Sequence, residues 1–277
     1  MRLASILGQQ GPRVVAQQGS DGVVLPVRSI RELLESDRLG EMARLLSTGT
    51  LPRVPTADAV FLPPIADPRK IICIGLNYRD HALEQAAPIP KEPVVFSKFP
   101  TSLTGHEQPI RLPAVSDEVD FEAELVVVLG RAGKDIPQEQ AMQHVAGYMI
   151  GHDVSARDWQ KKKDGKQWLL GKSFDTFAPT GPWLVTADEV PDPHALPIRL
   201  RLNGRVMQES NTAQLIFSVP YLIHYVSQVA TLEPGDLLFT GTPAGVGFAR
   251  QPPIFLKKGD VVEVEIDGLG LLRNTVV

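Results

Sequence analysis

The chain contains a single cysteine, which excludes an intramolecular disulfide bond. That residue, Cys73, lies in the apolar run Ile71–Ile74, a setting typical of a small buried side chain. No stretch approaches the roughly 20 apolar residues that span a bilayer. The apolar start Met1–Leu7 is too short for a secretory signal. We therefore expect no membrane association, and we expect the protein to be cytoplasmic.

The sequence also has little excess of charge, because its formal net charge is −4 at pH 7. Its one basic run, Lys161–Lys163, is followed by Asp164 and Gly165, which is typical of a solvated loop. A polybasic face is the electrostatic signature of a nucleic-acid-binding protein, so we expect no nucleic-acid partner. The rest of the composition, 43% hydrophobic and 22% charged over 277 residues, predicts a globular chain with one large domain or a large and a small one.

Turn-forming residues are abundant, since 24 prolines and 23 glycines separate many short β-branched runs. This pattern predicts a β-rich, mixed α/β fold. Asn203-Gly204 and Asp267-Gly268 indicate two hairpins, and apolar spacing predicts a helix over Val219–Val229. The predicted strands are Ile71–Gly75, Val94–Lys98, Ile110–Arg111, Phe121–Leu129, Val145–His152, Trp183–Thr186, Ile198–Leu202, Leu237–Thr240 and Val261–Ile266.

The N-terminal part of the chain differs in character from the rest. Apolar spacing predicts a helix over Ile30–Leu46, which Ser29 caps and which Gly40 weakens in its middle. A proline-rich segment, Pro52–Pro68, has the composition of a linker. We therefore expect a small N-terminal α/β domain with its linker over residues 1–68 and a main domain over residues 69–277.

The run Val119–Leu125 places two carboxylates on one side of a predicted strand. Side chains alternate between faces along a strand, so Glu122 and Glu124 point the same way while Phe121 and Ala123 face the core. Neighbouring carboxylates repel each other and are costly to keep ionised without a cation. The pattern indicates either a metal site or the exposed edge of a half-solvated sheet, and these residues alone leave both interpretations open.

A third carboxylate favours the metal site. Asp153 directly follows the apolar run Val145–His152, where the predicted strand passes into a polar loop. Three oxygen ligands with open coordination positions suit a hard cation such as Mg²⁺ or Mn²⁺. Zinc is more often accompanied by histidine or cysteine ligands.

A histidine and a glutamate lie three residues apart after the first predicted strand of the main domain. If this segment is helical, His81 and Glu84 share a face, and the carboxylate orients the imidazole and raises its basicity. Such a pair can act as a general base toward water. The alternative is a polar helix start with an incidental ion pair.

Gly171-Lys172-Ser173 has the ending of a phosphate-binding loop but not its spacing. That motif requires a glycine at position 166, which is Lys166, while Gly165 is one residue out of place. We therefore reject a nucleotide-binding interpretation. Lys172 is better interpreted as an ammonium group near a carboxylate substrate or a developing enolate.

These motifs occur together, in the same order, in one known family. Residues 70–277 resemble the fumarylacetoacetate hydrolase family, and most closely its longer members with an N-terminal extension. Each motif alone is weak, whereas the set in register is highly specific. The segments that carry the resemblance are Gly75–Glu84, Asp120–Leu125, Gly151–Gln160, Gly171–Asp175, Pro234–Asp236, Gly241–Gly247 and Leu256–Asp260.

The resemblance implies a fold, a cofactor and a set of site residues. The fold would be a mixed β-sandwich roll built on an incomplete β-barrel, in a homodimer. Glu122, Glu124 and Asp153 would hold Mg²⁺, or else Mn²⁺ or Ca²⁺, and Asp80 is left out of this set. His81 and Glu84 would form the catalytic dyad and Lys172 would stabilise an enolate. The substrate-binding residues would be Tyr78, Arg157, Gln160, Gly241 and Thr242.

The implied activity is hydrolysis of a C–C bond in an acylpyruvate-type or 2,4-dioxo carboxylic acid through an enolate, since the His81–Glu84 pair can activate water. The same family implies alternatives, namely an oxaloacetate tautomerase or decarboxylase, or a dienoate isomerase. A non-enzymatic metal-binding scaffold is disfavoured, because it would not need His81, Glu84 and Lys172.

Overall fold

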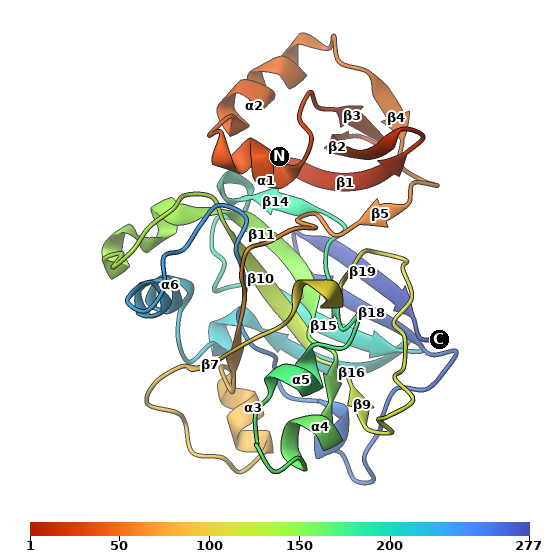
Figure 1. Cartoon of the computed structure of the whole chain (residues 1–277), viewed down its shortest axis with the longest axis vertical. Coiled ribbons are helices and arrows are strands. Elements are labelled where there is room, and N and C mark those ends of the chain that lie inside the picture. Colours follow the sequence, from red (N-terminus) through yellow and green to blue (C-terminus); the bar gives the residue numbers. More distant parts are fainter.

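The framework of the molecule is one open, 11-stranded mixed sheet (Figure 1). The computed structural model describes all residues from Met1 to Val277. The strands lie in the order β4-β3-β2-β1-β14-β11-β10-β17-β6-β7, and β5 pairs with β1 beside this path. Their bounds are β1 Arg2–Gly8, β2 Gly11–Gln18, β3 Asp21–Val24, β4 Arg53–Pro55, β5 Phe61–Leu62, β6 Ile71–Gly75, β7 Val94–Ser97, β10 Ala123–Leu129, β11 Val145–His152, β14 Leu184–Thr186 and β17 Leu237–Phe239.

A second, four-stranded antiparallel sheet has the order β16-β15-β18-β19, with β15 Pro197–Leu202, β16 Arg205–Asn211, β18 Val261–Ile266 and β19 Gly270–Thr275. Two short pairs join β9 Val119–Asp120 to β12 Ser155–Ala156, and β8 Leu103–Thr104 to β13 Ala178–Pro179. The α-helices are α1 Ile30–Glu35, α2 Leu39–Thr48, α3 Arg79–Glu84, α4 Arg157–Lys161, α5 Leu169–Lys172 and α6 Val219–Ser227. Short 3₁₀ helices are η1 Pro100–Ser102, η2 Gln138–His144, η3 Ala187–Glu189, η4 Thr212–Gln214 and η5 Gly247–Ala249. No helix is both long enough and apolar enough to cross a bilayer.

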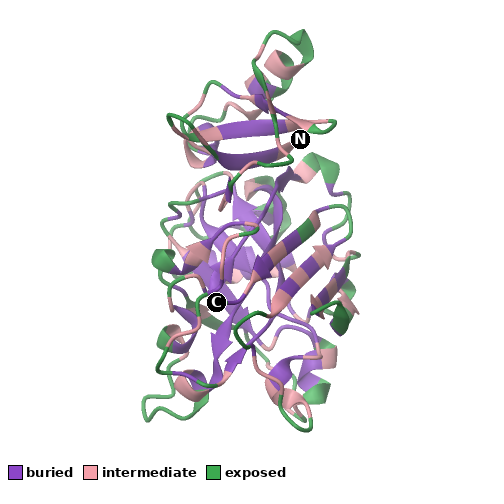
Figure 2. Cartoon of the chain, turned by 90° about the vertical axis from the view of Figure 1, so that its right-hand side faces the viewer, coloured by how far each residue is buried: buried purple, intermediate pink, exposed green.

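The central strands are buried on both faces, and each face belongs to a different apolar core. Along β10, Leu125 and Val127 pack into a cluster that also contains Leu200 of the smaller sheet. The alternate residues Val126 and Val128 pack into a second cluster on the opposite face. In the smaller sheet, β15 and β18 instead alternate between buried and more exposed residues (Figure 2). The two sheets therefore form a sandwich that remains open, with no closed barrel.

The N-terminal strands extend the large sheet. β1 pairs antiparallel with β14, with Leu3 opposite Leu184, so hydrogen bonding continues from the N-terminal strands to the centre of the molecule. Strands β1 and β2 were not among the sequence predictions. The N-terminal strands and the helices α1 and α2 form the upper layer in Figure 1. A domain boundary at residue 68 stays a prediction.

The helix predicted over Ile30–Leu46 is in fact two helices. Ser29 caps α1 as expected, because its hydroxyl accepts a hydrogen bond from the Glu32 N–H at 3.0 Å. The break lies before Gly40, at Asp37, whose φ of 52° is in the left-handed region and cannot continue an α-helix. Gly40 itself lies in the first turn of α2.

The strand predicted over Phe121–Leu129 begins two residues later than expected, so Glu122 lies in the gap between β9 and β10 and Glu124 lies within β10. β9 ends at Asp120 and β10 begins at Ala123. The N–H of Phe121 donates to the Asp120 carboxylate at 2.8 Å, and that of Ala123 donates to Gln208 Oε1 at 2.8 Å. Because these amides bond side chains instead of a neighbouring strand, the backbone leaves the sheet at Glu122.

The other predicted elements agree with the structure apart from small shifts at their ends, with one exception. Strands β6, β11 and β18 have the predicted bounds, and both predicted hairpins form. The φ values of the turn residues are positive, as such turns require: 51° at Asn203, 77° at Gly204 and 80° at Gly268. The exception is Ile110–Arg111, where only an isolated bridge from Ile110 to Val276 is present.

Asn77 joins three segments behind the site, and its side chain is fully buried. Its Nδ2 donates to the carbonyls of Thr240 and Phe217 at 2.8 and 3.1 Å, and its Oδ1 accepts from the Phe217 N–H at 2.8 Å.

We predict that Asn77→Ala lowers the free energy of unfolding by about 2–4 kcal/mol, since each buried polar group without a partner costs roughly 1–3 kcal/mol. Urea denaturation tests this, with the exposed Gln138→Ala as control. Equal stability of the two variants would contradict the assigned role.

Candidate functional site

Three buried carboxylates meet where β10 begins and β11 ends. The two strands are antiparallel, with Ala123 opposite His152, so Asp153 at the exit of β11 arrives beside Glu122 and Glu124. The Asp153 N–H donates to the Glu122 carbonyl at 2.9 Å. One carboxylate oxygen from each of the three residues lies within 4.8 Å of the others. The sequence-based grouping of these residues is therefore present in the structure, and the triad could bind a metal ion.

The Glu122 carboxylate forms ion pairs with cations from two helices. Lys172 Nζ, at the end of α5, donates to Glu122 Oε2 at 2.7 Å and to Asp153 Oδ2 at 2.8 Å. Arg157 Nη2, at the start of α4, donates to Glu122 Oε1 at 2.6 Å. Burial acts to raise the pKa of Glu122, but the Lys172 and Arg157 charges outweigh it and hold that pKa well below its ordinary value.

Glu124 has no cationic partner. Its Oε2 accepts a hydrogen bond from the Gly241 N–H at 2.8 Å, which is a weaker compensation than an ion pair. Burial, and then the negative charges of Asp153 and Glu122, raise the pKa of Glu124 well above its ordinary value. The ionised triad therefore lacks one positive charge beside Glu124, and a divalent cation among the three oxygens would supply it.

Lys98 belongs to this site, although the sequence reasoning did not select it. It follows β7, is almost completely buried, and its Nζ donates to Asp153 Oδ1 and to the Val154 carbonyl, the latter at 3.2 Å. The available signal was a lysine at the end of an apolar strand, which must find a partner if it is buried. The sequence does not show which carboxylate that partner is.

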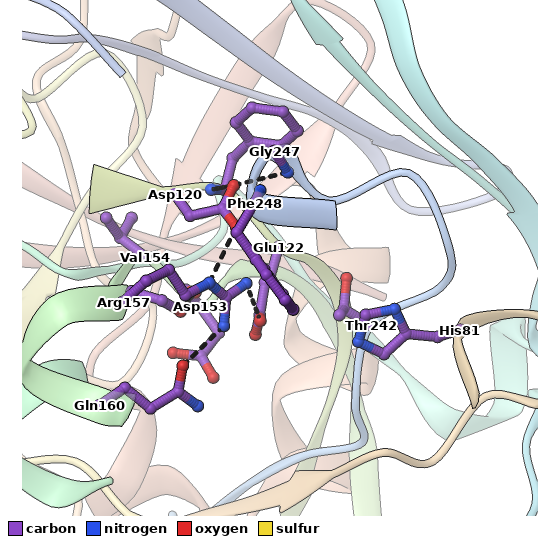
Figure 3. A network of polar contacts seen from close by, with 12 residues as sticks. His81, Asp120, Glu122, Asp153, Val154, Arg157, Gln160, Thr242, Gly247 and Phe248 are labelled. Carbon is purple, nitrogen blue, oxygen red and sulfur yellow. Dashed lines mark hydrogen bonds and ion pairs between the residues drawn. The ribbon is translucent and has the colours of Figure 1, made fainter. Parts of the chain in front are cut away.

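Arg157 is held by carboxylate and amide acceptors of the protein itself (Figure 3). Its Nε donates to Asp120 Oδ2 at 2.8 Å and its Nη1 to Gln160 Oε1 at 2.8 Å, in addition to the bond to Glu122. Asp120, to which no role was assigned from the sequence, also accepts the N–H groups of Gly247 and Phe248 at 2.7 and 3.1 Å. Asp120 and Arg157 thus fix the loop after β17 against the carboxylate triad.

His81 and Glu84 form the predicted pair on α3. His81 Nδ1 lies 3.0 Å from Glu84 Oε2, and the second oxygen of Glu84 accepts the Gly245 N–H at 2.8 Å. Because an ionised carboxylate only accepts, Nδ1 carries the proton and Nε2 keeps its lone pair, 2.6 Å from the Gln85 amide nitrogen. Asp80 lies outside the triad and accepts from the His81 N–H at 2.7 Å and from the Ser210 hydroxyl.

A cavity of about 160 Å³ connects these groups. It is smaller than the roughly 300–1,000 Å³ of ordinary ligand pockets, which suits a ligand of few atoms. The predicted residues that line it are His81, Glu122, Glu124, Arg157, Gln160, Lys172 and Thr242. The other lining residues are Ile74, Gly75, Leu76, Gln85, Phe96, Lys161, Trp168 and Phe248.

The structure does not bring every predicted substrate-binding group into this cavity. Tyr78 is completely buried outside its walls, and its hydroxyl has no hydrogen-bond partner. The Gly241 N–H is used by Glu124, and Thr242 Oγ1 accepts from Gln208 Nε2 at 2.9 Å. Of the three, Thr242 alone presents a side chain to the cavity.

The position of Glu124 predicts how the metal-free protein responds to pH. Because its pKa is raised, the folded chain retains a proton that the unfolded chain releases above the ordinary value of 4.5, so stability falls as pH rises beyond that value. We predict that Glu124→Gln removes this loss. In the presence of a chelator, the free energy of unfolding of Glu124→Gln, relative to that of the wild type, should increase from about pH 4 to pH 8.

Urea unfolding at the two pH values measures this effect, with the exposed Glu139→Gln as control. A stability difference between Glu124→Gln and the wild type that is the same at both pH values would contradict the assignment of an unpaired carboxylate to position 124.

The chain is similar to named proteins over nearly its whole length. It is 54% identical over 257 residues to the oxaloacetate tautomerase fahd2, mitochondrial, of Xenopus laevis, covering 91% of this chain and 79% of that protein. It is 49% identical over 276 residues to the oxaloacetate tautomerase FAHD2A, mitochondrial, of Homo sapiens, covering 96% and 88%. The cytoplasmic location expected from the sequence is wrong, because it is contradicted by these relatives, which are named as mitochondrial proteins.

A solved structure has the same fold. The fumarylacetoacetate hydrolase from the psychrophilic Exiguobacterium antarcticum superposes with a TM-score of 0.90 at 34% identity, covering 100% of this chain and 99% of that chain. The similarity includes the N-terminal layer, because the alignment covers both chains almost completely.

The family comparison covers the part of the chain that carries the site. Residues 70–277 match the family described as Fumarylacetoacetate (FAA) hydrolase C-terminal. That range contains the three carboxylates, the His81–Glu84 pair and the buried lysines. The resemblance inferred from the motifs is confirmed, and the chain belongs to the fumarylacetoacetate hydrolase family.

Proposed function

We propose that this chain is a divalent-metal-dependent enzyme that interconverts the keto and enol forms of oxaloacetate. The observation that carries the proposal is a base beside a carboxylate triad: His81 lines the same small cavity as Glu122 and Glu124. The names of the two relatives support the choice of oxaloacetate. They also support a mitochondrial compartment for this chain.

Glu122, Glu124 and Asp153 would hold Mg²⁺ or Mn²⁺, since all three offer hard oxygen ligands. When bound, the cation would supply polarisation of the 2-oxo group and stabilisation of the enolate. The residues fit this role because the triad carries one carboxylate without a cationic partner, Glu124.

His81 is placed to move the proton. Its Nδ1–H donates to Glu84, which leaves Nε2 as the basic atom. Nε2 can take a proton from C3 of the keto form and deliver it to the C2 oxygen, which gives the enol, and the reverse transfer regenerates the keto form. The Gln85 amide, 2.6 Å from Nε2, must give way to the substrate for this transfer. Lys172 uses two of its three N–H donors on Glu122 and Asp153. Its third donor remains for the oxygen that becomes negative in the enolate.

C–C hydrolysis of an acylpyruvate is a second candidate, because the His81–Glu84 pair could deprotonate a water instead of a carbon acid. The similar fold of a fumarylacetoacetate hydrolase supports this candidate. The two activities differ in their products, since hydrolysis of acetylpyruvate releases acetate and pyruvate, whereas tautomerisation leaves the carbon skeleton intact.

We predict that wild-type protein with Mg²⁺ accelerates the loss of enol-oxaloacetate absorbance, and that His81→Gln lowers this rate about 10²–10⁴-fold, the usual contribution of a general base. Mn²⁺ affinity, measured by calorimetry, should stay unchanged because His81 is not a proposed ligand. His144→Gln is a matched control, since that imidazole lies outside the cavity and its hydrogen bond is to the Arg131 carbonyl, at 3.2 Å.

A His81→Gln variant with the wild-type rate would overturn the assignment of the base. Wild-type protein that cleaves acetylpyruvate but leaves the enol of oxaloacetate unaffected would instead establish the hydrolase.

We also propose that the chain forms a homodimer through the free edge of β7. Large apolar side chains are exposed on and around this edge strand, which borders a cavity of about 840 Å³ beside α6. A free apolar edge promotes pairing with another strand, and a contiguous apolar patch marks an interface. The exposed residues are Val94, Val95, Phe99, Leu170 and Val229.

Light scattering at micromolar concentration should give twice the chain mass of 30.3 kDa. Val95→Lys should shift the protein toward the monomer, because a buried interface does not accommodate an unpaired charge. The control is Val206→Lys, at an exposed position of β16. A monomer mass for the wild type would contradict the proposal.

A further inference from the structure

One cation at the cavity is not used by the protein. Lys172 and Arg157 line the cavity and are bonded to its carboxylates. Lys161 lines the same cavity, but it forms no ion pair and no side-chain hydrogen bond. Its Nζ lies over the ring of Phe248, 3.6 Å from the centroid. An ammonium group held over an aromatic face keeps its N–H donors available to an anion.

The position of Lys161 follows from the helix that carries it. It is the last residue of α4 and lies four residues after Arg157, so both side chains project from one face of the helix. The Arg157 guanidinium carbon lies 4.4 Å from the centroid of the same Phe248 ring. Phe248 therefore holds Lys161 at the cavity that Glu122 and Glu124 line.

The electrostatic surroundings of Lys161 would favour an anion. Lys161 is an exposed residue, but partial desolvation of its ammonium group, and then the positive charge of Arg157, lower the pKa of Lys161 to about 8. A negative group brought next to this ammonium would relieve both effects, because it would compensate the charge locally. The neighbouring Lys162 already has such a partner, in Glu118.

We propose that Lys161 recognises a second, distal carboxylate of the substrate and so selects 2-oxo dicarboxylates over 2-oxo monocarboxylates. The 2-oxo carboxylate end lies at the triad and Lys172, and the distal carboxylate lies against the Lys161 ammonium. The proposal rests on the proposed function for the orientation of the substrate, and it adds a specificity-determining residue that the mechanism of proton transfer does not require.

Binding of unreactive ligands tests this independently of turnover. Malate and lactate share a 2-hydroxy carboxylate, and malate alone has the distal carboxylate. In calorimetry with Mg²⁺, the wild type should bind malate more tightly than lactate. Lys161→Met should weaken malate binding about 10- to 100-fold, the range expected for a charge-assisted hydrogen bond, and leave lactate binding unchanged. Lys161→Arg should restore most of the malate affinity.

Lys163→Met is the matched control, because Lys163 also lies over an aromatic ring, 4.4 Å from the centroid of Trp159, but does not line the cavity. It should bind both ligands as the wild type does. In turnover, Lys161→Met should raise the KM for enol-oxaloacetate with little change in kcat. The KM for the enol of acetylpyruvate, which is a monoanion, should stay unchanged.

The inference is overturned if Lys161→Met weakens malate and lactate equally, if it leaves malate binding unchanged, or if the wild type does not prefer malate. These outcomes are separable from failure of the proposed function. A protein that prefers malate through Lys161 but does not tautomerise oxaloacetate refutes the function alone. One that tautomerises oxaloacetate with no dependence on Lys161 refutes only the inference.

Discussion

The structure of the site depends on the compensation of buried negative charge. Four carboxylates, those of Asp120, Glu122, Glu124 and Asp153, lie out of water around the start of β10. An unpaired buried charge is costly, so each must have a cation or strong hydrogen-bond donors. The buried cations that meet this need are Lys98, Arg157 and Lys172, and they are shared among three of the carboxylates. Glu124 is left with a backbone N–H, and that deficit makes the site receptive to a metal ion.

The fold delivers these charges from separate parts of the chain. The antiparallel pairing of β10 with β11 brings Asp153 to the two glutamates, while the short helices α4 and α5 present Arg157 and Lys172 from one side. Departure of the backbone from the sheet at Glu122 depends on side-chain acceptors, those of Asp120 and Gln208. The open sandwich therefore supplies a rigid frame, and the polar network at one end of it determines where the functional groups point.

Features that depend on residues close together in the sequence could be predicted from it, whereas features that depend on residues far apart in the sequence could not. Strands such as β6 and β11 were predictable because their apolar runs are local, and the pairing of His81 with Glu84 because their spacing is that of one helical turn. The place of Lys98 in the site was not predictable, because its partner Asp153 is 55 residues away and no local sequence pattern indicates that pairing. The packing of Tyr78 away from the cavity likewise depends on tertiary contacts that a motif does not encode.

The central claim is that the three carboxylates are the ligands of one divalent cation, and diffraction from crystals grown with Mn²⁺ tests it most directly. We predict a single anomalous peak per chain among the oxygens of Glu122, Glu124 and Asp153, at roughly 2.0–2.3 Å from each, with Lys172 still bonded to the triad. A peak elsewhere, or none at millimolar Mn²⁺ with the three carboxylates in their present positions, would contradict the account.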